Sequence, residues 1–170
     1  MYAKAERVVY RLRVDASVRQ YLDELLNQLR SARREAELPQ RLLAPQVQVA
    51  TTSLADWEAR RDDPTMAHLI RWADALGFRL VIVDPRGSPN LSAGRSGEGE
   101  SWEQCEMRRL AAALRIRRRS WDMSQETLAD LVGVSRISMQ RWENVQVFPR
   151  PIAFLVWVKA LGCTVALHKK

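Results

Sequence analysis

The sequence has few of the residues that form cross-links, metal centres or catalytic sites. It contains two cysteines, Cys105 and Cys163, and two histidines, His68 and His168, at spacings that match neither a disulfide framework nor a metal site. It also lacks a Ser/His/Asp or Cys/His constellation and a glycine-rich loop that could cradle a phosphate. We therefore interpret the cysteines as structural thiols and expect no catalytic residues, no metal, no cofactor and no enzymatic activity.

Long apolar runs are missing as well. No stretch approaches the roughly 20 apolar residues of a membrane-spanning helix, and the N-terminal MYAKAERVVYRLRVD lacks the apolar run of a signal peptide. With 46% hydrophobic and 28% charged residues, the composition is typical of a globular protein with a real core. We expect a cytoplasmic protein that makes no membrane contact.

Acidic residues are fewer than basic residues, mainly in the second part of the chain. The formal net charge is +7. Residues 1–84 hold 13 Lys/Arg against 12 Asp/Glu, a net charge of +1, whereas residues 85–170 hold 14 against 8, a net charge of +6. An excess of this kind favours a polyanionic partner such as nucleic acid.

The chain contains an internal repeat with a period of 85 residues. Residues 25–82 align on residues 110–167 without a gap, and 18 of the 58 pairs are identical. The identical pairs include apolar and turn residues, among them Leu25 and Leu110, Trp57 and Trp142, Trp72 and Trp157, and Gly77 and Gly162. We therefore predict two homologous units, in residues 1–83 and 102–170. Between them, DPRGSPNLSAGRSGEGES (residues 84–101) is rich in Gly, Ser and Pro, which predicts a flexible linker.

The second unit is predicted to begin with two helices. A helical rhythm of apolar residues covers residues 106–119. The next helix is expected to start at Ser124 as N-cap and to stop at Gly133, burying Leu128, Leu131 and Val132.

Two more helices and a strand are predicted to follow. Ser135 can cap a third helix, in which Ile137 or Met139 joins Trp142 on the buried side. A fourth helix is expected to start near Pro149 or Pro151 and to end at Gly162. The segment CTVAL after it favours a short strand.

The first unit is predicted to repeat this plan, with helices over residues 21–34, 51–58 and 66–76 and a strand in FRLVIV. Its second helix has less favourable residues, because Pro39 replaces the serine cap, Pro45 lies inside the helix and Gln48 replaces the turn glycine. We expect a shortened or irregular element there. Ahead of this unit, the alternation in RVVYRLRV (residues 7–14) favours a strand, with a helical extension as the alternative.

The run SQETLADLVGVSRISMQRWEN, residues 124–144, resembles the phage-repressor-like, or XRE, family of helix-turn-helix domains. The resemblance depends on five features: Gln125, Leu128-Ala129, Gly133-Val134-Ser135, Ser138 and Trp142-Glu143. It covers residues 106–162, and a weaker copy covers residues 25–77. It implies a mainly α fold with two tandem lambda-repressor-like helix-turn-helix domains, each followed by a short strand.

The same resemblance implies a set of DNA contacts in the second unit. Because the third helix of such domains enters the major groove, the expected base-reading residues are Ser135, Arg136, Ile137, Gln140 and Arg141. The expected phosphate contacts are Gln125, Asn144, Arg118 and Arg119. The partner would then be double-stranded DNA, in association with the nucleoid.

The first unit departs from the family pattern on its corresponding face. Asp56 stands where the second unit has Arg141, and a carboxylate there would repel phosphate. Weak DNA contact by this unit is left open, through Gln40, Thr51, Thr52, Arg60 and Arg61.

The strands after the two helical sets resemble the arrangement in HipB-like antitoxins. An isolated strand would leave its backbone donors and acceptors unpaired, so we expect FRLVIV and CTVAL to pair as a small antiparallel sheet. The chain would then be a monomeric pseudo-dimer that regulates transcription by occupying an operator, as a repressor for instance. A domain-swapped homodimer is the main structural alternative. The functional alternative is an antitoxin-like protein whose first unit binds another protein.

Overall fold

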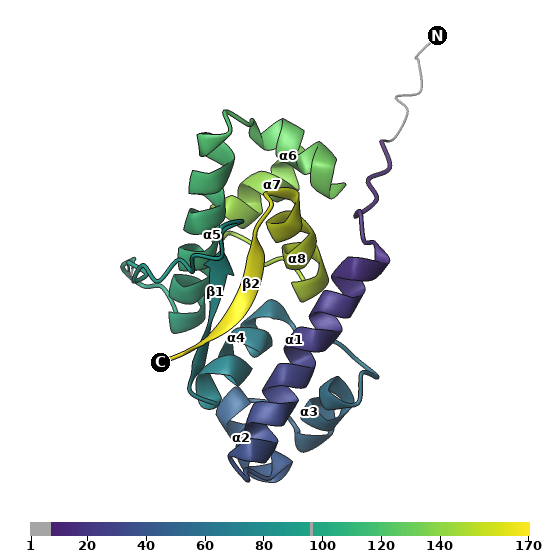
Figure 1. Ribbon diagram of the computed structural model, residues 1–170, viewed down its shortest axis with the longest axis vertical. Coiled ribbons are helices and arrows are strands. Elements are labelled where there is room, and N and C mark those ends of the chain that lie inside the picture. The colour runs from purple at the N-terminus through teal and green to yellow at the C-terminus, as the bar shows by residue number, and fades with distance from the viewer. Residues whose placement is uncertain (1–7, 96) are drawn as a thin grey trace.

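The computed structural model describes residues 8–95 and 97–170. These residues form a mainly helical protein with one small sheet (Figure 1). In chain order the elements are α1 (Ala16–Glu35), α2 (Gln40–Val47), α3 (Thr51–Glu58), α4 (Met66–Ala75), β1 (Phe78–Val83), α5 (Trp102–Ser120), α6 (Gln125–Val132), α7 (Arg136–Glu143), α8 (Pro151–Ala160) and β2 (Thr164–Lys169). None of the helices in this part of the chain is long and apolar enough to cross a membrane.

The elements of residues 16–83, the first half, follow the same order as those of residues 102–169, the second half. Helices α2, α3 and α4 have the same lengths as α6, α7 and α8. The two halves also share four positions with positive φ that lie 85 residues apart: Glu37 and Asp122, Gln48 and Gly133, Arg60 and Val145, and Gly77 and Gly162. The backbone therefore turns with the period found in the sequence.

The two strands pair with each other inside one chain, which confirms the expected antiparallel sheet. Leu80 lies opposite Leu167, and Val83 lies opposite Thr164. The described residues of the connection between β1 and α5 form turns and irregular structure. The division of the chain into two domains and a linker, which includes the undescribed residue 96, stays a prediction.

Each half sends its first helix onto the strand of the other half. The Tyr21 hydroxyl of α1 accepts a hydrogen bond from the Val165 backbone N–H at 2.8 Å and donates one to the Val165 carbonyl. At Leu80, the strand position that corresponds to Val165 in the repeat, Nη2 of Arg109 in α5 donates to the backbone carbonyl at 2.5 Å. The halves are therefore interlocked through side-chain bonds to strand backbone as well as through the sheet.

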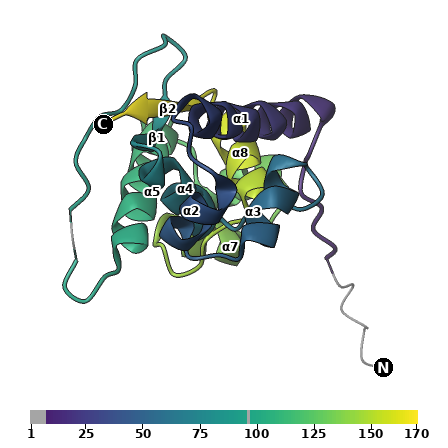
Figure 2. The ribbon, with the colours of Figure 1, turned by 90° about the horizontal axis from the view of Figure 1, so that it is seen from below.

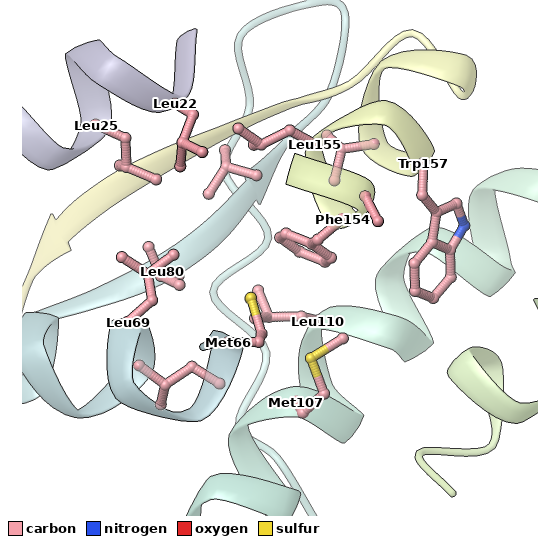
Figure 3. Close-up of a cluster of buried hydrophobic side chains, with 14 of the residues drawn as sticks. Leu22, Leu25, Met66, Leu69, Leu80, Met107, Leu110, Phe154, Leu155 and Trp157 are labelled. Atoms are coloured by element: carbon pink, nitrogen blue, oxygen red, sulfur yellow. The ribbon is translucent and has the colours of Figure 1, made fainter. Parts of the chain in front are cut away.

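A single hydrophobic core joins the two halves. Figure 3 shows side chains from both halves in one cluster, drawn from α1, α4, β1, α5 and α8: Leu22, Leu25, Met66, Leu69, Leu80, Met107, Leu110, Phe154, Leu155 and Trp157. All ten are buried. The sheet and α8 lie between α2 and α3 at one end of the molecule and α6 and α7 at the other (Figure 1).

Helix α2 is regular, so the expected shortened or irregular element is wrong. The helix has eight residues, as α6 has, with Pro45 inside it. Loss of one backbone donor at a proline costs about 3 kcal/mol, but burial of a Leu or Val side chain returns about 1.5–3 kcal/mol, and Leu43 and Val47 are fully buried. Gln48 adopts the left-handed conformation at φ 64° and caps the helix in place of glycine.

The strand or helix expected for residues 7–14 is not formed over residues 8–14, and residue 7 lies outside the described residues. The segment instead runs without regular secondary structure to the turn between α6 and α7, where the Arg13 N–H donates to the Val132 carbonyl at 2.9 Å. The alternating pattern does not match the burial, because Leu12 packs against the core while Val8, Tyr10 and Val14 are exposed, as Arg11 and Arg13 are. No neighbouring strand satisfies the rest of its backbone within the described residues.

Two apolar side chains near the α6–α7 turn point outward. Leu131 was expected in the core but is 45% exposed, and Ile137 is 60% exposed. Leu128 and Val132 alone supply the large apolar side chains that α6 buries, and Met139 takes the inward place on α7. The buried stripe of α6 is therefore narrower than the sequence pattern indicates.

Gly133 meets two constraints that no other residue type satisfies together. Its φ is +88°, and a Cβ added there would overlap the Arg11 carbonyl, with the carbonyl carbon 2.7 Å away. Gly77 has a similar φ of +80°, with nothing within 4 Å of its added Cβ. An alanine at position 77 would thus have the same strained backbone conformation as one at position 133, but its Cβ would not approach another part of the chain.

Gly133→Ala should therefore destabilise the protein more than Gly77→Ala. Left-handed backbone costs an alanine about 1–2 kcal/mol at either place, and overlap with residue 11 should add about 1–3 kcal/mol at position 133. Urea unfolding of the two variants measures the difference. Equal losses would mean that residues 11–13 do not rest against this turn in solution.

Candidate nucleic-acid interface

Helix α7 has a buried inner side and an exposed, mainly polar outer side. Ser135 is its N-cap, and the Oγ of Ser135 accepts from the Ser138 backbone N–H at 3.0 Å. Met139 is fully buried and Trp142 nearly so. The expected base-reading residues lie on the other side, where the side chains of four of them are exposed: Arg136, Ile137, Gln140 and Arg141. The fifth, Ser135, is half-buried and serves as the cap.

The inner face of α7 is held by a buried carboxylate. The Glu143 side chain has no exposed surface. It accepts hydrogen bonds from Nε and Nη2 of Arg118 at 2.6 and 3.0 Å and from Nε2 of Gln125 at 2.8 Å. Since the three residues belong to α7, α5 and α6, one ionic network fixes the orientation of α7 on the two helices beneath it.

The first half contains the same network at positions 85 residues earlier. Glu58 accepts from Nε and Nη2 of Arg33 at 2.6 and 2.8 Å and from Nε2 of Gln40 at 2.8 Å. Hydrogen bonding to Glu58 raises the pKa of the Arg33 guanidinium above its ordinary value. Nη1 of Arg33 donates to the Leu38 carbonyl, as Nη1 of Arg118 donates to that of Met123. Helix α3 is therefore anchored in the same way as α7.

Each network lies beside a pair of packed tryptophans. The rings of Trp57 and Trp72 lie 6.0 Å apart at 34°, and those of Trp142 and Trp157 lie 6.0 Å apart at 32°. All four are buried, so they pack the core and cannot stack on bases.

The networks change how the expected phosphate contacts can act. Arg118 is only 7% exposed, and three of its nitrogens are occupied by Glu143 and the Met123 carbonyl. The side-chain amide of Gln125 donates a hydrogen bond to Glu143, and Gln125 is half-buried at the start of α6. Asn144 is half-buried as the C-cap of α7, and Arg119 is exposed at the end of α5. Arg118 therefore has a structural role, and it is no longer proposed as a phosphate contact.

Sequence reasoning missed Arg30 and Arg34 in the first half and Arg115 in the second as candidate contacts. Arg30 and Arg34 of α1 line a shallow surface pocket beside Gln40 and the end of α3. Arg115 and Arg119 hold the equivalent positions on α5. Nε of Arg30 and Nε of Arg115 are buried and have no hydrogen-bond partner among the described residues. The signal was present in the sequence, because Arg30 and Arg115 are an identical pair of the repeat.

The outer face of α3 carries less positive charge than that of α7. Thr51 and Thr52 are exposed in its first turn. Nε of Arg61 pairs with Asp56 at 2.9 Å. Arg60 is tied to two acidic residues, Asp23 and Asp63. The expected weak contacts Arg60 and Arg61 are thus neutralised within the first half, whereas Thr51 and Thr52 remain accessible.

Helices α3 and α7 lie in different parts of the molecule. Figure 1 separates α3 and α7 along the long axis, and Figure 2, at right angles, shows α7 on the side away from α1 and the sheet, while α3 packs against α1. Two recognition helices that contact one duplex together must be about one turn of DNA apart.

Comparison with known proteins bears on the first half. A family model described as Helix-turn-helix matches residues 29–83, which include α2, α3 and α4. No curated protein and no solved structure matches the chain. The family match supports the resemblance to XRE-type domains, and it lies on the unit whose sequence pattern is the weaker copy.

The chain therefore contains a helix-turn-helix domain. Domains of this family bind DNA, so the match suggests a DNA-binding transcription regulator with DNA as its partner. It leaves the second half, the contact residues and the assembly to be argued from geometry.

The buried networks make a clear prediction for stability. Glu143→Ala should lower the free energy of unfolding by about 3–5 kcal/mol, because it leaves the buried guanidinium of Arg118 without its charge partner. Asp56→Ala removes an exposed pair with Arg61 and should cost less than about 1 kcal/mol. Chemical denaturation checks both values. A loss at Glu143 no larger than that at Asp56 would contradict the network.

Proposed function

We propose that the protein is a sequence-specific transcription regulator in which the second half reads bases and the first half holds the DNA backbone. On this proposal both halves are helix-turn-helix units, and the single chain acts as a pseudo-dimer on one operator. The observation that carries it is the pair of matched buried networks, Glu58 with Arg33 and Glu143 with Arg118, which hold α3 and α7 in equivalent ways.

Base reading is assigned to α7 because of its exposed side chains. Arg136 and Arg141 are exposed and, among the described residues, neither is in an ion pair. A guanidinium can donate two parallel hydrogen bonds to O6 and N7 of guanine, and Gln140 can pair with adenine. Ile137, at 60% exposed, offers an apolar contact for a thymine methyl group.

Backbone contact is assigned to equivalent groups in both halves. Arg30 and Arg34 beside Gln40 correspond to Arg115 and Arg119 beside Gln125, and the bifurcated guanidinium suits phosphate. Thr51 and Thr52 can add hydroxyl donors in the first half, and Asn144 an amide donor in the second. Such contacts set register and salt dependence without reading sequence.

The pseudo-dimer is supported by the sheet between β1 and β2 and by the exchange of α1 and α5 across it. Dimeric helix-turn-helix proteins place two recognition helices about 34–36 Å apart, one turn of the duplex. One chain with this arrangement needs no second copy. Because α3 and α7 differ on their outer faces, the operator would be non-palindromic.

Selection of bound sequences from random duplex DNA tests the base-reading assignment. The native protein should enrich a motif that Arg136→Ala with Arg141→Ala loses, since each bidentate contact is worth about 1–3 kcal/mol of discrimination. The matched control is Thr51→Ala with Asp56→Ala, at the equivalent positions of α3, and it should retain the motif. A motif unchanged in the arginine variant would refute the role of α7.

The two-unit assignment makes a separate prediction. Arg30→Ala with Arg34→Ala should weaken binding to all sequences equally and lower the slope of log affinity against log salt by about two. Arg115→Ala with Arg119→Ala should have the same effect if the halves act alike. Titrations over a salt series measure both slopes. A reduced slope in the second variant only would mean that the first half does not touch DNA.

A second candidate function is supported by the acidic residues after α3. Asp62 and Asp63 are exposed on the first half, and a carboxylate surface suits a basic protein partner better than DNA. On this reading the protein is antitoxin-like, with the first half on a partner and the second half on DNA. Failure of the random-duplex selection together with a stoichiometric co-purifying protein would favour it.

A further inference from the structure

The segment of residues 8–14, called the arm from here on, connects the two halves at the proposed interface. It precedes α1 of the first half but lies against the second half. The Arg13 N–H donates to the Val132 carbonyl at the end of α6. The Arg11 carbonyl occupies the space that a side chain at Gly133 would need. The arm is thus seated on the turn that leads into α7.

The course of the arm brings it to the proposed DNA-binding side. In Figure 2 it runs from the level of α1 and the sheet toward the side of α7, on the edge opposite the connection between β1 and α5. It passes the α6–α7 turn, whose last residue, Ser135, caps α7. Groups that project from the arm therefore lie near the start of the proposed recognition helix.

Leu12 is the one side chain of the arm that is partly buried, and its other side chains are exposed. Leu12 packs against the hydrophobic core, while Arg11 and Arg13 on either side of it are exposed. Leu12 therefore anchors the arm, and the exposed guanidinium groups of Arg11 and Arg13 lie on either side of this anchor. Among the described residues neither guanidinium has an ion-pair or hydrogen-bond partner, unlike that of Arg19, which pairs with Asp63.

We propose that the arm is an additional DNA-contacting element, in which Arg11 and Arg13 bind backbone phosphates beside the half-site of α7. This inference rests on the proposed function. Two unpaired guanidinium groups on a backbone fixed by Leu12 and by the Val132 carbonyl form a pre-arranged site for phosphate oxygens. The arm would lengthen the footprint of the second half alone, because it docks on that half only.

Salt titration of the full-length protein on a duplex that it binds tests the arm. Arg11→Ala with Arg13→Ala should lower the slope of log affinity against log salt by about two and weaken binding on the order of ten- to thirtyfold near physiological salt. The matched control is Arg86→Ala with Arg95→Ala. It removes the same charge from the connection at the opposite edge (Figure 2) and should leave slope and affinity unchanged.

Ethylation interference adds a positional measurement. The native protein should need phosphates at the outer edge of the α7 half-site that the Arg11/Arg13 variant no longer needs, with no change at the other half-site. Equal unfolding midpoints of the two double variants would show that both are folded, as expected for exposed side chains.

The outcomes separate this inference from the proposed function. If the native protein binds the duplex but the arm variant has the slope and affinity of the control, the arm inference is overturned and the helix-turn-helix assignment stands. If the native protein does not bind duplex DNA even at low salt, the proposed function fails, and the arm inference fails with it.

Discussion

Pairing of β1 with β2 is the constraint on which the arrangement of the molecule depends. Each strand is only six residues long and would leave its backbone donors and acceptors unpaired on its own. Antiparallel pairing satisfies those that face the partner strand. Side chains of the helices then bond outward-facing backbone groups, Tyr21 of α1 at Val165 and Arg109 of α5 at Leu80. The shared core then follows, because α4 and α8 lie under the same sheet and bury Met66 and Phe154 in one cluster (Figure 3). The positions of α3 and α7 are consequences of this central packing.

Burial of a charged pair under each of these two helices adds orientation to that packing. Removing Glu143 and Arg118 from water costs several kcal/mol for each ion, and Coulomb attraction in the interior returns this only when geometry is good. Arg118 donates two direct hydrogen bonds to the Glu143 carboxylate, and its remaining guanidinium nitrogen donates to a backbone carbonyl. An apolar pair could fill the same volume, but it would not fix the rotation of α7 about its axis. On the proposed function, fixed rotation matters because α7 must present Arg136 and Arg141 to a groove.

The helices and strands could be predicted from the sequence more accurately than the side-chain contacts between them. Sequence reasoning predicted α3 at Thr51–Glu58 and the two strands from the internal repeat and the local residue pattern, both of which are read along the chain. It failed at α2, where burial of Leu43 and Val47 outweighs Pro45, and at residues 8–14, whose partner is a carbonyl 119 positions away. In the candidate site, α7 could be read from its pattern alone. The burial of Arg118 could not, since an arginine bound to an internal carboxylate and one free for phosphate look alike in sequence.

The asymmetry of the two halves follows from their being in one chain. In a homodimer, any substitution on a recognition helix appears in both copies and keeps the operator palindromic. Here Thr51 and Asp56 stand on α3 where Arg136 and Arg141 stand on α7, although the networks beneath them are the same. The residues that position the helices are thus the same in both halves, while those that face outward differ. On the proposed function, one half is then free to lose base contacts provided that it still holds phosphates, and the arm seated on Gly133 adds positive charge to the half that reads.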